Sequence, residues 1–142
     1  MKVGADLAPL FVEVESHVRR HDARAAQPPV CVVHHVDRRS RLIELLIPID
    51  RKVPATGRIK IVSTPAAAVA SSLVVGGYDG LPEVTTELAS WAERTGRRVA
   101  GPPWHVYLRF GAEEELRLPA QYLTTNEREL VTEVLVAVQP AG

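Results

Sequence analysis

Two stretches of the chain carry apolar residues at the spacing of a helix. The first consists of Leu7, Leu10, Phe11, Val14 and Val18. The second consists of Leu81, Val84, Leu88, Trp91 and Ala92. Residues three and four positions apart share one side of a helix, so each set forms an apolar stripe. The pattern predicts two amphipathic helices and favours a core position for Trp91.

Prolines and cap residues indicate where these helices begin and end. Asp6 suits the N-cap of the first helix, and Pro9 is tolerated only in a first turn. Pro82 suits the first position of the second helix, and Gly96 suits the position just past its end. The first helix is therefore expected to begin directly after Asp6.

Extended, β-branched runs surround the helices. After the helices they predict strands over residues 30–36, 42–49, 103–110 and 131–138. Between the halves, GRIKIVS (57–63) alternates as a strand, Pro65 breaks it, and AVASSLVV (68–75) runs extended. The second half therefore reads as strand, helix, strand, strand, and the first half lacks its opening strands.

The two halves of the sequence resemble each other. A shift of 74 residues places QPPVCVVHHV (27–36) on GPPWHVYLRF (101–110) without gaps. The strands IELLIPI (43–49) and TEVLVAV (132–138) then close the two halves. This shared order predicts an internal duplication. Unit one would cover about residues 1–50 and unit two about 58–139 of a single domain that spans residues 1–142.

The duplication predicts an α+β fold. Two tandem strand-helix-strand-strand units would be related by a pseudo-twofold axis, with a ligand cleft between them. Without its opening strands, unit one leaves a sheet edge whose backbone groups are unpaired. Either a partner chain covers that edge, as in a homodimer, or the protein starts upstream of Met1.

Alternation along the strands determines which side chains share a face. Trp104 and Val106 share one face, which we expect to pack under the second helix because it is apolar. The opposite face then carries His105 and Tyr107 together with Glu133. These three residues are therefore expected to lie on the cleft side of unit two.

In the first half, the same register groups Cys31 and Val33 with Glu44. A pseudo-twofold axis would bring the two cleft faces together, so Glu44 and Glu133 are expected to line a groove with apolar and aromatic walls. Such walls with a few polar groups are typical of small-molecule pockets. A carboxylate without a fixed basic neighbour favours a cationic ligand or a proton, and Tyr107 would add a cation–π contact.

Composition narrows the class of protein. The chain has 142 residues, 46% of them hydrophobic, and 17 basic residues balance 17 acidic ones. Nucleic-acid binders normally carry a basic excess, so we expect no direct contact with nucleic acid. No apolar run reaches the roughly 18–20 residues of a membrane span, and no signal peptide is evident. A single cysteine, Cys31, fits a reducing compartment, so we expect a cytoplasmic protein without membrane contact.

Signatures of cofactors and common nucleophiles are absent from the sequence. His17 and His21 lie four residues apart and His34 and His35 are adjacent, but spacing alone is weak support for a zinc site. The chain contains no Gly-x-Ser-x-Gly elbow, Walker loop or dinucleotide fingerprint. We expect neither a metal nor another cofactor.

The ordered motifs of the second half resemble the GyrI-like small-molecule-binding domain. This domain is also the effector-binding half of AraC- and MerR-type multidrug-responsive regulators. The matching motifs are Gly76-Gly77-Tyr78, Trp91, Gly101-Pro102-Pro103, Tyr107-Leu108 and Thr132-Glu133. QPPVCVVHHV, IELLIPI and GRIKIVSTP match in the first half, so the resemblance covers nearly the whole chain.

The resemblance implies a cleft that binds small hydrophobic, often cationic, molecules through an acidic residue among aromatic ones. Glu133 and Tyr107 match that role, whereas His105 stands where the family often has Glu. We expect a stand-alone sensor or sequestering protein of xenobiotic response, or the effector-binding part of a transcription regulator. The expected ligand-binding residues are Glu133, Tyr107, His105, Glu44, Cys31, Val33, Tyr78 and Trp91.

Two alternatives stay open at this point. Some stand-alone members of the family resemble hydrolases that open cyclopropane-containing electrophilic toxins, with a cleft Glu placing the attacking water. Glu133 and Tyr107 would then be catalytic, and His105 would fit acid–base chemistry. The second alternative is an inhibitor that acts by protein contact, as the family name suggests.

Overall fold

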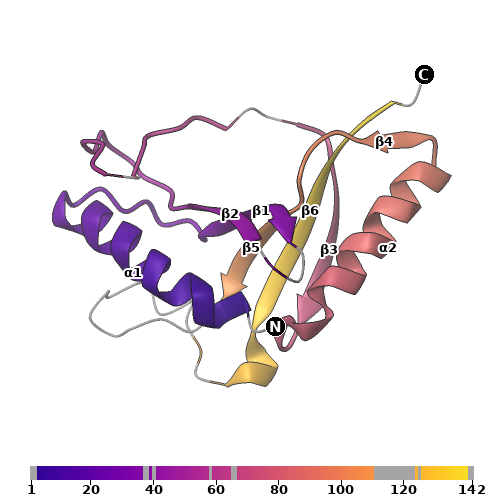
Figure 1. The fold of residues 1–142 in the computed structure, drawn as a ribbon, viewed down its shortest axis with the longest axis horizontal. Coiled ribbons are helices and arrows are strands. Elements are labelled where there is room, and N and C mark those ends of the chain that lie inside the picture. The colour runs from indigo at the N-terminus through magenta and orange to yellow at the C-terminus, as the bar shows by residue number, and fades with distance from the viewer. Residues whose placement is uncertain are drawn as a thin grey trace.

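The computed structural model describes residues 3–36, 39, 41–57, 59–64, 67–110, 124 and 126–140. The elements follow one another as α1 (Val3–Arg20), β1 (Val30–Val36), β2 (Arg41–Leu46), β3 (Val69–Val75), the 3₁₀ turn η1 (Tyr78–Gly80), α2 (Leu81–Arg94), β4 (Arg97–Val99), β5 (Trp104–Arg109), the 3₁₀ turn η4 (Glu127–Glu129) and β6 (Val131–Pro140). Figure 1 shows one sheet with α1 near one end and α2 near the other.

The sheet is antiparallel at every pairing of the described strands. Its order is β2-β1-β5-β6-β3, and the short β4 pairs with the far end of β6. The fold therefore combines two helices with a mostly antiparallel sheet, which confirms the mixed α and β character expected from the sequence. In both halves a helix is followed by a pair of antiparallel strands, β1–β2 and β5–β6, and the second half adds β3 before its helix and the short β4 after it.

The second half is closely packed. Leu88 and Ala92 of α2 are buried, and Leu88 belongs to a cluster with Ala70 of β3 and Val134 of β6. The helix carries a proline in its first turn and is followed by Gly96 at a φ of +80°, a conformation that favours glycine. The helix starts at Leu81, one residue before the expected Pro82, and Gly96 stands just past its end as expected.

The first helix begins earlier than its sequence suggested. α1 starts at Val3, so Asp6 is not its cap, and Pro9 lies inside the helix. A proline within a helix cannot donate the usual backbone hydrogen bond to the residue four positions earlier. The expected start was wrong because the helical turn before Pro9 forms in spite of that missing donor.

Two groups of apolar contacts pack α1 against the rest of the chain. Its Phe11 ring meets Phe110 edge to face, with ring centroids 5.6 Å apart. Val18 packs with Ala23 and Val53 near the end of the helix, below the loop that follows β2. Among the described side chains of α1, Phe11 thus contacts the sheet side and Val18 contacts the loop.

Most predicted strands are present, although the strand predicted over 42–49 ends at Leu46, and there are two further differences. Residues 57 and 59–63 form no strand and contribute only an isolated bridge between Thr56 and Ile59. An alternating pattern becomes a strand only where a neighbouring strand offers a ladder, and this segment has none. The sequence pattern also missed β4, whose three residues are too few to show a period.

Candidate functional site

The strand registers define two faces of the sheet, because paired residues of antiparallel strands point to the same side. Phe11 of α1 packs with Tyr107, and Leu88 of α2 packs with Val134, so both helices lie on what we call the covered face. That face carries Cys31, Val33, Ile43, Leu45, Ala70, Ser72, Val74, His105, Tyr107, Thr132, Val134 and Val136. The open face carries Val30, Val32, Glu44, Leu46, Val69, Ser71, Leu73, Val75, Trp104, Val106, Glu133, Leu135 and Ala137.

This assignment corrects the expected orientation of β5. His105 and Tyr107 lie on the covered face and are 6% and 7% exposed, whereas Trp104 and Val106 lie on the open face. Val106 pairs with Glu133, so the carboxylate shares a face with the apolar residues. The prediction was wrong because alternation shows which residues share a face but not which face a helix covers.

The same correction applies to β1. Cys31 and Val33 pair with Leu45 and Ile43 on the covered face, away from Glu44. Cys31 is fully buried, and both residues pack in the cluster that contains Tyr107. The expected orientation of β6 is confirmed, because its valines at 134 and 136 pack against α2 while the carboxylate of residue 133 points to the open face.

The two expected carboxylates occupy matching places. Glu44 pairs with Val32, and Glu133 pairs with Val106, the residue that the shift of 74 places on Val32. Cys31 and His105, which the same shift equates, are direct partners in the β1–β5 ladder. Both carboxylates therefore lie on the open face, one on each side of the β1–β5 pair.

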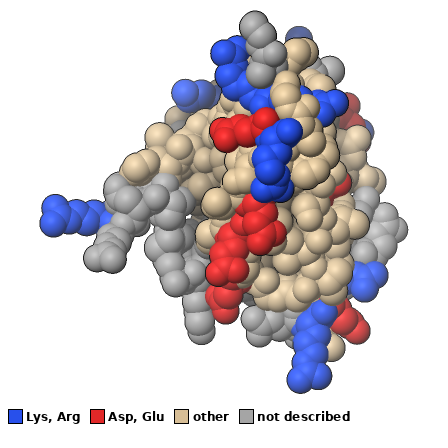
Figure 2. Space-filling model, turned by 90° about the vertical axis from the view of Figure 1, so that its right-hand side faces the viewer, with Lys and Arg blue, Asp and Glu red and all other residues tan. Residues whose placement is uncertain are grey.

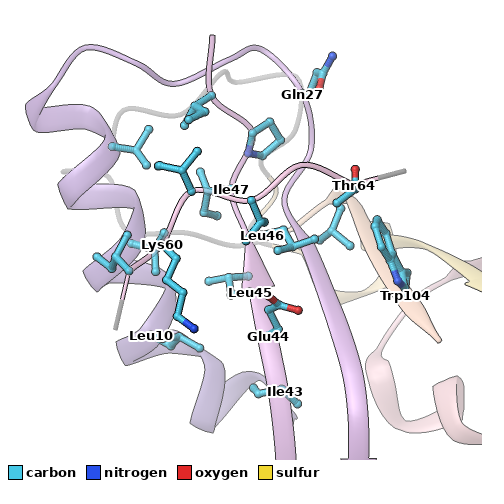
Figure 3. Close-up of a pocket in the computed structure, with 18 of the residues that line it drawn as sticks. Leu10, Gln27, Ile43, Glu44, Leu45, Leu46, Ile47, Lys60, Thr64 and Trp104 are labelled. Atoms are coloured by element: carbon cyan, nitrogen blue, oxygen red, sulfur yellow. The ribbon is translucent and has the colours of Figure 1, made fainter. Parts of the chain in front are cut away.

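A cavity of about 930 Å³ lies at the β2 end of the sheet. Its wall combines residues of α1, residues 42–46 of β2 with the loop after it, residues 59–62 and 64, and the start of β5. The labelled residues of Figure 3 are Leu10, Gln27, Ile43, Glu44, Leu45, Leu46, Ile47, Lys60, Thr64 and Trp104. Volumes of about 300–1,000 Å³ are usual for sites that hold small molecules.

The cavity extends around the free edge of β2. Figure 3 shows Leu10 and Lys60 on one side of this strand and Trp104 with Thr64 on the other. In the second half, β3 pairs with the outer edge of β6, but no described strand pairs with the outer edge of β2. The cavity therefore lies beside an unpaired strand edge, at the position that β3 fills in the other half.

A few polar groups interrupt the apolar wall. The Glu44 carboxylate lies 3.2 Å from Nε2 of His34, which also lines the cavity. His17 Nε2 lies 2.7 Å from the carbonyl oxygen of Pro54 and is occupied by that contact. Lys60 adds a positive charge, so the described residues of the wall include one lysine and one glutamate.

The remaining expected site residues lie outside this wall. Glu133 is partly buried on the open face, next to the wall residue Val106. Tyr78 meets Tyr107 edge to face at 5.8 Å and contributes to the clusters under both helices. Trp91 is 46% exposed on α2, so the expectation that it lies in the core was wrong. Ala92, its neighbour, takes the buried position at that turn of the helix.

Three polar side chains, those of His105, Tyr107 and Thr132, are buried on the covered face. Burial raises the pKa of Tyr107 well above its ordinary value of 10.0, and the nearby Cys31 and Tyr78 add to the effect. Burial lowers the pKa of His105, whose Nδ1 has no hydrogen-bond partner among the described residues. The Thr132 hydroxyl, on the neighbouring strand, also has no hydrogen-bond partner among the described residues. These side chains stay uncharged near neutral pH and belong to the core.

The described residues contain neither a metal-binding cluster nor a membrane-spanning helix. No group of three or more His, Cys, Asp or Glu side chains in that part of the chain could hold a metal ion. No helix there is long and apolar enough to cross a membrane.

Comparison with known proteins gave structural matches only. No family model and no curated protein matches the chain. The fold is similar to EcmrR in a cryo-EM structure of the EcmrR–DNA complex in EcmrR-RPo, with a TM-score of 0.78 and 15% identity over 96% of this chain and 49% of that chain. It is also similar to the crystal structure of the EcmrR C-terminal domain, with a TM-score of 0.70 and 16% identity over 93% of this chain and 81% of that one.

These similarities show the fold. This chain spans about half the length of EcmrR in the DNA complex. The separate EcmrR C-terminal domain matches 93% of this chain, so the two share a fold. The expectation that this chain makes no contact with nucleic acid stays a prediction.

Several cavity residues were not among those expected from the sequence. Trp104 and Lys60 are the clearest cases, because Trp104 had been assigned to the core and Lys60 to a strand. The signal that identifies Trp104 is the pairing of Val106 with Glu133, which places Trp104 on the carboxylate side. Pairing between distant strands cannot be read from alternation alone.

Proposed function

We propose that this protein is an effector-binding domain that takes a small, largely apolar molecule into the cavity beside β2. The observation that carries the proposal is a 930 Å³ cavity that combines an aliphatic wall, an indole and a single carboxylate. Apolar walls with a few converging polar groups provide affinity through burial and orientation through the polar contacts. Trp104 would stack on the ligand, and Glu44 would orient it.

The similarity to the EcmrR C-terminal domain supports a role in regulation. So does the ordered resemblance of the sequence motifs to the GyrI-like domain of AraC- and MerR-type regulators. On this basis the ligand would act as an effector, sensed either by a stand-alone protein or by the effector-binding part of a transcription regulator. The two tandem units and their pseudo-twofold axis are part of the same proposal, supported by the partnership of Cys31 and His105.

The preference for cationic ligands is weaker than the sequence suggested. Lys60 lines the same cavity as Glu44, and His34 contacts the Glu44 carboxylate. A positive ligand would have to compete with both, so a neutral apolar compound fits the wall better. A cation would bind best along the open face between Glu44 and Glu133.

The hydrolase alternative finds little support in the geometry. It requires Glu133 and Tyr107 to act on one substrate, but Tyr107 lies on the covered face and Glu133 on the open face. The sheet separates the two side chains, and Tyr107 is only 7% exposed. No described residue near Glu133 replaces the tyrosine, so we retain the binding function.

Tryptophan fluorescence tests the proposed site, because the chain has two tryptophans in different places. In Trp91→Phe protein only Trp104 emits, and titration with neutral and cationic aromatic compounds should change its emission. In Trp104→Phe protein the emission of Trp91 should not respond to the same compounds.

A thermal-shift measurement completes the test. A ligand that binds the folded state at 100 times its Kd stabilises that state by about 2.7 kcal/mol. Glu44→Gln should change the ranking of neutral and cationic compounds, whereas Glu87→Gln, an exposed carboxylate of α2, should not. Equal responses from Trp104 and Trp91, or no stabilisation by any compound, would contradict the proposed site.

A further inference from the structure

The two edges of the sheet are protected to different degrees. Proteins usually guard edge strands with charges, prolines or covering segments, because free backbone groups pair readily with other chains. β2 carries Glu44 at its middle, and the segment 59–64 lies across the cavity at its edge. β3, at the other end, is seven residues long and reads VASSLVV, without a charge or a proline.

Apolar side chains stand exposed along this unguarded strand. On the open face Val69 is 48% exposed, Leu73 is 62% exposed and Val75 is 71% exposed. Figure 2 views the molecule from the α2 side, where the charged side chains gather in a band and leave uncharged surface beside it. A long apolar edge without guarding charges indicates a pairing surface.

The sequence of β3 is complementary to itself when two copies run antiparallel. With Ser72 opposite Ser72 of the second copy, each Val69 meets a Val75 and each Ser71 meets a Leu73 on the open face. On the covered face each Ala70 meets a Val74. All seven residues find partners in this register, and no like charges meet.

The helix above β3 adds a second apolar element. Trp91 lies two turns after Val84, so both project from the same side of α2. Val84 and Val74 of β3 both pack against the cluster that contains Ala70 and Leu88, so this side of the helix lies near β3. The half-exposed Trp91 would thus flank the paired strands on the covered side.

We propose that two copies of this chain form a symmetric dimer by pairing their β3 edges in the register centred on Ser72. The joined sheet would have both open faces on the same side. The cavities beside β2 would stand at its two far ends, so dimer formation and ligand binding would not obstruct each other. The partner is therefore a second copy of the same chain, held by backbone ladder bonds and by the row of valine and leucine side chains.

Sedimentation velocity of the full chain tests the dimer. Wild type should sediment as a dimer at micromolar concentration, and Leu73→Lys should sediment as a monomer at the same concentration. Leu42→Lys is the matched control, because Leu42 is also 62% exposed but lies on the opposite edge strand. A wild-type monomer at all concentrations, or a dimer lost in Leu42→Lys and kept in Leu73→Lys, would overturn the proposal.

Cross-linking tests the register even if Leu73→Lys fails to fold. A mixture of Val69→Cys and Val75→Cys proteins should form a disulfide between copies, whereas each variant alone should not. Residues 69 of the two copies would be six positions out of register, or about 20 Å apart. The only native cysteine, Cys31, is fully buried and should not compete. A disulfide within either single variant, or none in the mixture, would exclude this register.

Discussion

The two helices of this protein meet the sheet in different ways. α2 packs against β3, β4 and β6, and its buried side chains join one continuous cluster. α1 reaches the sheet through Phe11 and otherwise packs on the loop after β2, with a cavity between these contacts. The difference follows from one strand, because β3 supports α2 while no described strand lies in the corresponding place under α1. A space suited to a ligand can thus arise where a repeated unit lacks one element.

Each half also uses a different kind of interaction to hold its helix. In the first half, the fully buried Glu15 of α1 accepts hydrogen bonds at both carboxylate oxygens from Nε of Arg24, at 3.0 Å each. Burial raises the pKa of Glu15, and Arg24 opposes that rise. In the described part of the second half, α2 is held mainly by apolar contacts with the cluster around Leu88 and Val134. The contrast suggests substitutions that affect one half more than the other.

The largest expected effect is the loss of the Glu15–Arg24 pair. Glu15→Ala leaves the Arg24 guanidinium, which is 13% exposed, without its carboxylate. Removing one member of a buried ion pair typically costs about 3–5 kcal/mol. Urea unfolding should show this loss, and the exposed Glu87→Ala on α2 should change stability by less than about 0.5 kcal/mol. Equal small effects would mean that the pair does not hold α1.

A smaller difference in stability is expected when apolar contacts of the two helices are removed. Leu88→Ala empties a packed site under α2 and should cost about 2–5 kcal/mol. Leu10→Ala enlarges a cavity that already exists, so its cost should stay below about 1.5 kcal/mol, near the value for partly buried positions. Chemical denaturation of the two variants compares them directly. A larger cost for Leu10→Ala would indicate that the cavity wall is packed as tightly as the α2 half.

The smallest expected effect is a change of folding stability with pH that arises from His105 on the covered face. Burial lowers the pKa of His105 from its ordinary value of 6.5, so the folded protein binds fewer protons there than the unfolded chain. The resulting stability is fully present above pH 6.5 and is lost as the pH falls through the lower folded pKa. The buried Glu15 acts in the opposite direction, because its raised pKa reduces stability as the pH rises above 4.5.

Thermal unfolding between pH 7 and pH 5 measures the His105 effect. His105→Leu should lose less stability on acidification than wild type does, because its partners Cys31 and Val134 then surround a side chain that cannot be charged. His21→Gln, at an exposed site, should retain the wild-type slope. Parallel slopes for all three proteins would show that His105 does not control the acid response.

Much of the fold followed from local patterns, and the failures have a common cause. The second helix, its proline and glycine ends, β3 and the paired strands after each helix agree with expectation, because these features depend on neighbouring residues. The predicted orientation of β1 and β5 was wrong because their residues on the open face are as apolar as those expected on a covered face. Polar residues such as His105 and Tyr107 are buried here, against the usual trend.

The candidate site was predictable only in part. Glu44 was expected from the recurrence of a Glu in both closing strands, and it lines the cavity. Trp104 was missed because its position depends on the register with Leu135, a residue 31 positions away in the chain. The cavity depends on the lack of a described strand at the outer edge of β2. The sequence of β2 itself carries no pattern that shows whether a neighbouring strand is present.

The junction of the two halves gives this protein a built-in chemical reporter. Only three residue pairs join β1 to β5, and Cys31 with His105 is the middle one. The chain has no other cysteine, and this one is fully buried. A thiol reagent can reach it only when the halves separate or the helix above it lifts, so the rate of labelling reads the frequency of such openings. A ligand bound on either side of that junction would slow the modification of the Cys31 thiol.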